Sequence, residues 1–319
     1  MIEVKHLTKK YGTHLAVDDL SFTIEKGRIY GFLGPNGAGK STTMNIMTGY
    51  IGASSGEVII NGHNILEEPE KTKKCIGYLP EIPPLYLDMT VSEYLYFAAE
   101  LKKIPKADRN AQVIKVMELI KLVDMKNRLI KNLSKGYRQR TGLAAAILDF
   151  PDIIILDEPT VGLDPKQIIE IRELIRKLAK KHTVILSSHI LAEVREVCDY
   201  IMIISGGKLV ASDTTENLEN MMSGKGQIEV EAKAPRDEMD HIIRRTGKIK
   251  EVKYRTSASG ITTAQITAKG GEDIREELFL AFSHADVPML TLNQSKTTLE
   301  EIFLELTQGS GNRMIKEEK

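Results

Sequence analysis

The sequence has few features of a disulfide-rich, metal-binding or nucleic-acid-binding protein. Its only two cysteines, Cys75 and Cys198, are far apart and follow no paired spacing, which disfavours a disulfide framework or a zinc site. We expect both to be buried thiols in a reducing compartment. Lysine plus arginine and aspartate plus glutamate both number 44, so no net charge favours nucleic acid as a partner.

Long hydrophobic runs are also missing. The longest apolar stretches, 153–156 and 200–204, are far shorter than the roughly 20 residues that cross a bilayer as a helix. The N-terminus has no basic region followed by an apolar one, so it does not resemble a signal peptide. We therefore expect no direct membrane insertion, and any membrane role would use a partner protein.

The first 222 residues have the pattern of an α/β domain. At 319 residues the chain can hold two domains, and β-rich apolar runs alternate with amphipathic helices in 1–222, which predicts a largely parallel sheet. Asn61-Gly62 predicts a type I′ hairpin turn, and hence an antiparallel β part near the N-terminus. Thr90 and Glu93 have the spacing of a capping box, which predicts a helix to about Lys103.

Residues 223–319 are predicted to form a second, smaller α+β domain after a Ser-Gly-Lys-Gly linker. The expected elements are strand 227–233, helix 238–246, strands 250–255 and 262–268, helix 274–283, strand 289–292 and helix 297–307. The β-α-β-β-α-β order is that of a ferredoxin-like sandwich, followed here by an extra helix.

A glycine-rich loop between a predicted strand and a predicted helix is the first candidate site. In such a loop, backbone N–H groups turn toward phosphate oxygens, lysine neutralises the β and γ phosphates, and the serine hydroxyl binds Mg²⁺. The alternative is a chance glycine-rich turn, which the flanking strand and helix disfavour. The candidate nucleotide-binding residues are Gly34, Pro35, Asn36, Gly37, Ala38, Gly39, Lys40, Ser41 and Thr42.

Two carboxylates follow the apolar run 153–156. A buried strand would deliver Asp157 to the carboxyl edge of the sheet, where its carboxylate can hold the Mg²⁺ hydration shell. Glu158, one residue later, suits a catalytic role in orienting or deprotonating the attacking water. The alternative is an acidic turn that merely caps a strand.

Several further segments resemble ABC ATPases in both residues and order. Residues 133–137, Leu-Ser-Lys-Gly-Tyr, resemble the signature motif of that family, with lysine and tyrosine where glycine and glutamine are more common. Ser134 and Gly136 open a predicted helix whose N-terminus could meet a γ-phosphate. In the family, this contact is made across a dimer of cassettes. Taken alone, Ser134 would equally be an ordinary helix cap.

The resemblance assigns roles to three further residues. His189, after a predicted strand, matches the switch histidine that contacts the γ-phosphate, where an isolated histidine would otherwise be structural. Asp164 lies in a segment that resembles the loop between the two nucleotide sites, and it would also cap the helix that starts at Pro165. Tyr11 matches the aromatic residue that stacks on adenine; the alternative is a core or edge tyrosine.

Glu81 departs from the family pattern, which usually has glutamine here, in contact with Mg²⁺ and with the membrane domain. A carboxylate can also coordinate Mg²⁺, although Glu81 could be only a surface charge. Residues 82–100 would then form the surface that receives the membrane partner.

The resemblance covers residues 1–220 and implies an α/β P-loop NTPase of ABC type, with a RecA-like core, an antiparallel β subdomain and a helical subdomain. It implies an ATPase that binds ATP and Mg²⁺, pairs with a second ATP-binding subunit, and powers export through separate transmembrane permease subunits at the cytoplasmic face of the membrane. The substrate stays open. The alternative function is a regulatory or structural ABC ATPase outside transport, against which Glu158 and His189 argue.

Overall fold

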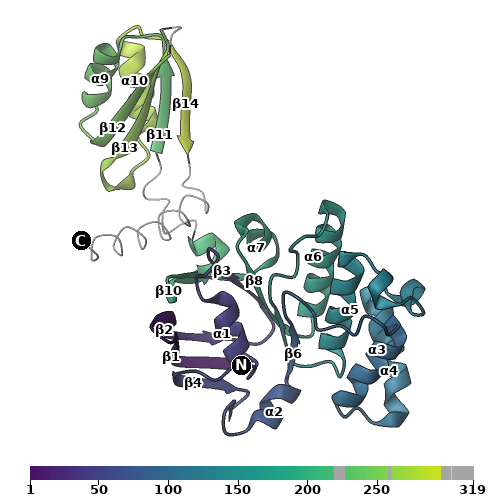
Figure 1. Cartoon of the computed structure of the whole chain (residues 1–319). Helices are drawn as coiled ribbons and strands as arrows, with labels where there is room; N and C mark the ends of the chain where they lie inside the picture. The colour runs from purple at the N-terminus through teal and green to yellow at the C-terminus, as the bar shows by residue number, and fades with distance from the viewer. Residues whose placement is uncertain (219–226, 258–259, 296–302, 304–319) are drawn as a thin grey trace. The chain divides into compact units, whose positions relative to one another are not determined.

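The computed structural model describes residues 1–218, 227–257 and 260–295, together with Phe303 (Figure 1). These residues form two compact units, one that contains Met1–Thr215 and one that starts at Glu216, and each is described by itself. The domain boundary expected at residue 222 lies outside the described residues, as does the helix expected at 297–307 apart from Phe303.

A six-stranded sheet forms the centre of the first unit. Its order is β10-β9-β3-β8-β7-β6, and every neighbouring pair is parallel except β9 and β10. The strands β3, β7 and β8 are buried along their whole length, as is usual for parallel strands that are covered on both faces. The bounds are β3 Ile29–Leu33, β6 Ile76–Leu79, β7 Ile153–Leu156, β8 Thr183–Ser188, β9 Tyr200–Ser205 and β10 Lys208–Thr214.

A second, antiparallel sheet of four strands lies against helix α1 (Lys40–Met47; Figure 1), in the order β2-β1-β4-β5. Its strands are β1 Ile2–Tyr11, β2 His14–Ile24, β4 Ser55–Ile60 and β5 His63–Asn64. The predicted hairpin turn is confirmed: Ile60 pairs with His63, and Asn61 and Gly62 both have positive φ, 50° and 85°. The antiparallel β part expected near the N-terminus is therefore present.

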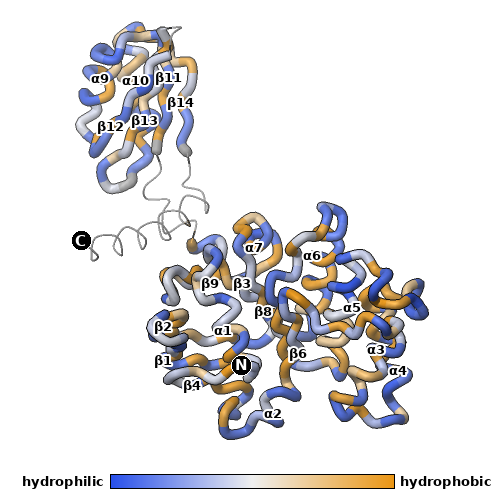
Figure 2. The backbone as a smooth tube through the Cα atoms, in the orientation of Figure 1, coloured by the Kyte–Doolittle hydropathy of each residue, from blue (hydrophilic) through white to orange (hydrophobic). Residues whose placement is uncertain are grey.

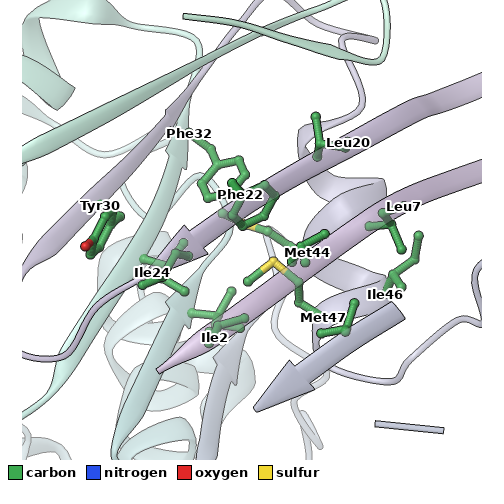
Figure 3. Close-up of a cluster of buried hydrophobic side chains, with 14 of the residues drawn as sticks. Ile2, Leu7, Leu20, Phe22, Ile24, Tyr30, Phe32, Met44, Ile46 and Met47 are labelled. Carbon is green, nitrogen blue, oxygen red and sulfur yellow. The ribbon is translucent and has the colours of Figure 1, made fainter. Parts of the chain in front are cut away.

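A hydrophobic core joins this sheet to the central one through α1 (Figure 3). Met44 and Met47 of α1 are fully buried beside β-strand residues such as Leu7, and the rings of Phe22 and Phe32 meet edge to face at 5.3 Å. Figure 2 shows hydrophobic residues along β6. This core holds α1 in place, and α1 directly follows the glycine-rich loop.

The helices of the first unit cover the central sheet and form a separate helical part of α3, α4 and α5 (Figure 1). Helix α3 has the predicted Thr90–Glu93 capping box but ends at Leu101, because Lys103 adopts a left-handed φ of 58° that reverses the chain. Short 3₁₀ turns occur at Val123–Met125 and Ile130–Asn132. The helices are α1 Lys40–Met47, α2 Pro69–Lys74, α3 Val91–Leu101, α4 Lys106–Ile120, α5 Lys135–Ile147, α6 Pro165–Ala179 and α7 Leu191–Val197.

The two cysteines have different environments. Cys198 is buried as expected, but Cys75 is only half-buried, so the expectation of two buried thiols is wrong for Cys75. Cys75 lies at the C-terminal end of α2, where it packs against the hydrophobic core and its thiol donates to the carbonyl of Lys71. Among the described residues, no helix is long and apolar enough to span a bilayer.

The second unit has the predicted β-α-β-β-α-β order. Its antiparallel sheet runs β12-β13-β11-β14, the strand order of a ferredoxin-like sandwich, and its core contains Ile228, Ile243 and Phe282. A 3₁₀ turn, Lys269–Gly271, follows β13. The elements are β11 Gln227–Ala232, α9 Arg236–Arg244, β12 Ile249–Thr256, β13 Thr262–Ala268, α10 Arg275–His284 and β14 Met289–Ser295.

Candidate nucleotide site

The glycine-rich loop joins the carboxyl end of β3 to the start of α1. Gly39 has a φ of 104°, and a Cβ there would lie 2.5 Å from the carbonyl oxygen of Ala16, so the position needs glycine for both shape and packing. Lys40 begins α1 and is only 5% exposed. Its ammonium donates to the carbonyls of Gly34 at 2.8 Å and Pro35 at 3.2 Å. The loop therefore forms a cradle around the lysine head group.

Asp157 and Glu158 follow β7 at the same edge of the sheet. The Glu158 carboxylate lies 3.7 Å from the Lys40 ammonium, and both side chains are buried. Glu158 has a left-handed φ of 47°, a conformation that ordinary residues adopt mainly where the surrounding structure imposes it, often at functional sites. Burial lowers the pKa of Lys40, and the nearby Glu158 and Asp157 carboxylates act in the opposite direction.

Ser41 and Asp157 form a pair of oxygen donors. The Ser41 hydroxyl donates to Asp157 Oδ1 at 3.1 Å. Two oxygens at this separation match neighbouring positions around an octahedral Mg²⁺, whose ligands lie about 2.1 Å from the ion. Among the described residues, no cluster of three or more His, Cys, Asp or Glu side chains could hold a metal unaided. This chain therefore offers Mg²⁺ a partial ligand set, as suits an ion shared with phosphates and water.

His189 adds an imidazole ring beside the carboxylates of Asp157 and Glu158. It follows β8, and its Nδ1 lies 3.0 Å from Glu158 Oε2. Ser187, two residues earlier and fully buried, donates to Asp157 Oδ1 at 2.6 Å and accepts from the Glu158 backbone N–H at 2.8 Å. The parallel pairing of β7 with β8 brings these residues together.

A cavity of about 500 Å³ unites most of the predicted site. Tyr11 and Glu81 both line it, although they are far apart in the sequence. Tyr11 is half exposed, and the Lys9 ammonium lies over its ring. The residues that line it are Tyr11, His14, Ala16, Asn36, Gly37, Ala38, Gly39, Lys40, Ser41, Thr42, Glu81, Glu158, Val161 and His189. Its volume is in the range of small-molecule sites.

Six predicted residues do not line this cavity. Three of them, Gly34, Pro35 and Asp157, hydrogen-bond to Lys40 or Ser41, which do line it, and the other three lie elsewhere. Ser134 caps α5 by accepting from the Tyr137 N–H, and Asp164 caps α6 by accepting from the Gln167 N–H at 2.9 Å. The two helix starts touch, because a Cβ on Gly136 would lie 2.5 Å from the Gln167 side chain. The structure thus places Ser134, Gly136 and Asp164 in a second group, separate from the glycine-rich loop.

Sequence reasoning missed Ser187 and the buried pair Thr160 and Glu193, which hydrogen-bond to each other. A signal for Ser187 existed, since it ends an apolar run just as Asp157 does, and parallel strands bring such ends together. No local pattern marks Thr160 or Glu193, because their contact joins a loop to a helix 33 residues further along the chain.

Comparison with known proteins identifies the family. Residues 17–161 match the family model described as ABC transporter. The bacitracin transport ATP-binding protein BcrA of Bacillus licheniformis is 40% identical over 221 residues, 69% of this chain and 71% of that protein. The linearmycin resistance ATP-binding protein LnrL of Bacillus subtilis is 30% identical over 308 residues, 96% of this chain and 98% of that protein.

This chain belongs to the ABC transporter family. As a member it is an ATP-binding cassette and an ATPase. A solved dimeric cassette in a post-hydrolysis state, bound to ADP and Pi, is 25% identical with a TM-score of 0.61, and the match covers 67% of this chain and 98% of that structure. The expected P-loop fold of ABC type is therefore confirmed.

Proposed function

We propose that this cassette hydrolyses ATP with Mg²⁺ in a site shared between two cassettes, and thereby powers export through a separate permease. The observation that carries the proposal is the convergence of Lys40, Glu158 and His189 on one cavity, with Ser134 and Gly136 outside it. One chain then supplies half of each site, and the signature helix α5 of the partner cassette supplies the rest.

Each residue in the cavity has a distinct task in this proposal. Lys40 offsets the charge of the β and γ phosphates, while Ser41 and Asp157 hold Mg²⁺, which neutralises charge on the phosphates when bound. Glu158 accepts a hydrogen bond from the attacking water, and His189, 3.0 Å from that carboxylate, helps to fix its orientation. Tyr11 would stack on the adenine ring, and the Glu81 carboxylate in the cavity lining would offer Mg²⁺ a further oxygen ligand.

The relatives and one surface of the cassette support the proposed partner and a class of cargo. A groove of about 600 Å³ lies beside the cavity. Glu81 and Asp157 line this groove and also belong to the candidate nucleotide site. Ile82, another lining residue, is 83% exposed. A helix of a permease would dock in this mainly apolar groove. The names of BcrA and LnrL support an antibiotic or a related toxic compound as cargo. Purification from native membranes would identify the accompanying permease.

The decisive experiment uses Glu158→Gln, which keeps the shape of the side chain and removes its charge. With ATP and Mg²⁺, this variant should accumulate as a dimer in light scattering, because ATP closes the shared sites and hydrolysis no longer reopens them. The control is the double variant Lys40→Ala/Glu158→Gln, which should stay monomeric for lack of tight ATP binding. A Glu158→Gln protein that stays monomeric at saturating ATP would contradict the shared site.

A further inference from the structure

A buried carboxylate near the candidate site, that of Glu193, has no cationic partner among the residues that the structure describes. Glu193 lies in the first turn of α7 and is 7% exposed. Among the described residues, no lysine, arginine or histidine forms an ion pair with it. A buried charge is costly unless hydrogen-bond donors satisfy it, so its donors must be well placed.

Two hydroxyl groups provide those donors, and they belong to different segments. Thr160 Oγ1 donates to Glu193 Oε2 at 2.5 Å, and Ser188 Oγ donates to the same oxygen at 3.1 Å. Both donor residues are buried, so water does not compete for these bonds. Ser188 Oγ also accepts from the Ile190 N–H at 3.0 Å, which ties the hydroxyl to the turn around His189.

These contacts close a ring through the site. Thr160 is two residues beyond Glu158 and four before Asp164, while Ser188 directly precedes His189. His189 in turn contacts Glu158 at 3.0 Å. The ring of contacts and neighbouring residues therefore runs from Glu158 to Thr160 and Glu193. It continues from Glu193 to Ser188 and His189, and it returns to Glu158. A shift of one segment must stretch a buried hydrogen bond or move the other segment.

We propose that Glu193 is a positioning residue that locks the turn of His189 to the loop of Asp164, so that the two segments move together. A role limited to capping α7 would not need Thr160, which comes from another element. The catalytic consequence rests on the proposed function, because it assumes that Glu158 and His189 act on ATP. The mechanical link itself is a property of the chain without nucleotide.

Hydrogen–deuterium exchange on the nucleotide-free protein tests the link directly. Thr160→Val keeps the side-chain volume and removes one donor. We expect faster exchange in the peptide that covers 188–192, 28 or more residues away in sequence, as well as in 160–164. The matched control on the same helix is Glu196→Gln, whose carboxylate pairs with Arg172 away from the ring, and it should leave both peptides unchanged. Faster exchange in 160–164 alone would overturn the proposal.

ATPase kinetics test the consequence for catalysis. Thr160→Val should lower kcat about tenfold with KM changed less than about twofold, because misplaced groups cost rate more than nucleotide binding. Glu193→Gln retains an acceptor oxygen and should keep kcat within about threefold of wild type. If the Glu193 variant does not fold, Thr160→Val still decides. A wild-type protein without ATPase activity would refute the proposed function, and the exchange experiment would still decide the link. Unchanged kcat in Thr160→Val would overturn the positioning role.

Discussion

Glu81 adds a second carboxylate to a cavity that already holds Glu158, in a family that usually has glutamine at this position. Without Mg²⁺, its negative charge should repel the triphosphate; with Mg²⁺, the charge is offset. We expect Glu81→Gln to raise ATP affinity severalfold in EDTA and to change it little with Mg²⁺, as measured with a fluorescent ATP analogue. Glu118→Gln, remote from the cavity, is the charge-matched control. An unchanged ratio of the two affinities would contradict this role.

Lys102 should make stability depend on pH. Burial lowers its pKa to about 8, and its ammonium donates to the carbonyls of Ala146 and Leu148, both at 2.7 Å. The unfolded chain, with an ordinary lysine pKa near 10.5, binds more protons between pH 8 and 10.5, so this residue's contribution to stability rises with pH over that window.

The size of this effect follows from the shift in pKa. Relative to Lys102→Met, the wild-type free energy of unfolding should increase by about 2 kcal/mol between pH 8 and 10. Urea denaturation at several pH values measures it, and Lys106→Met, at the exposed start of α4, controls for loss of a lysine charge. A constant difference between wild type and Lys102→Met across this range would show that the Lys102 pKa is not lowered.

At the scale of elements, Asp164 is expected to serve both as a helix cap and as part of a functional loop, and two substitutions separate these roles. Asp164→Asn keeps a side-chain oxygen for the Gln167 N–H, so the stability of the fold should change little. Asp164→Ala loses the cap and should cost about 1 kcal/mol in urea denaturation. If the loop needs the carboxylate charge, both variants should lose ATPase activity. Full activity in Asp164→Asn would leave only the capping role.

Elements that depend on local signals could be predicted from the sequence. The strand, glycine-rich loop and helix around Lys40, the Asn61-Gly62 turn and the Thr90 capping box need only neighbouring residues, and the structure contains each of them. The same holds for the element order of the second unit. These features are short-range, because turn and cap geometry are decided within about four residues.

Features that depend on strand register or on long-range contacts could not be predicted. The Ser187 hydroxyl meets Asp157 only because β7 and β8 pair in parallel with Leu156 opposite Leu186. The Thr160 to Glu193 bond requires the loop after β7 to pack on α7. The early end of α3 follows from a left-handed Lys103, and lysine gives no local signal for that conformation. Such contacts are decided by tertiary packing.

At the scale of the whole molecule, the separation of the two groups of site residues predicts complementation between inactive cassettes. Lys40→Ala should inactivate the glycine-rich loop. Ser134→Asp retains a helix cap but places a negative charge where the signature helix meets the γ-phosphate of the partner's nucleotide. Each variant alone should form dimers in which both shared sites are defective.

Mixing these two variants should restore activity. In a mixed dimer, one site combines both defects, whereas the other combines an intact loop with an intact signature helix. Random pairing makes half of the dimers mixed, so ATPase activity should recover to about a quarter of wild type if the sites act independently. Lys40→Ala mixed with Glu158→Gln is the matched control, because both lie on the loop side and no mixed dimer gains an intact site. Equal recovery in both mixtures, or none in either, would show that the catalytic site is not divided between chains.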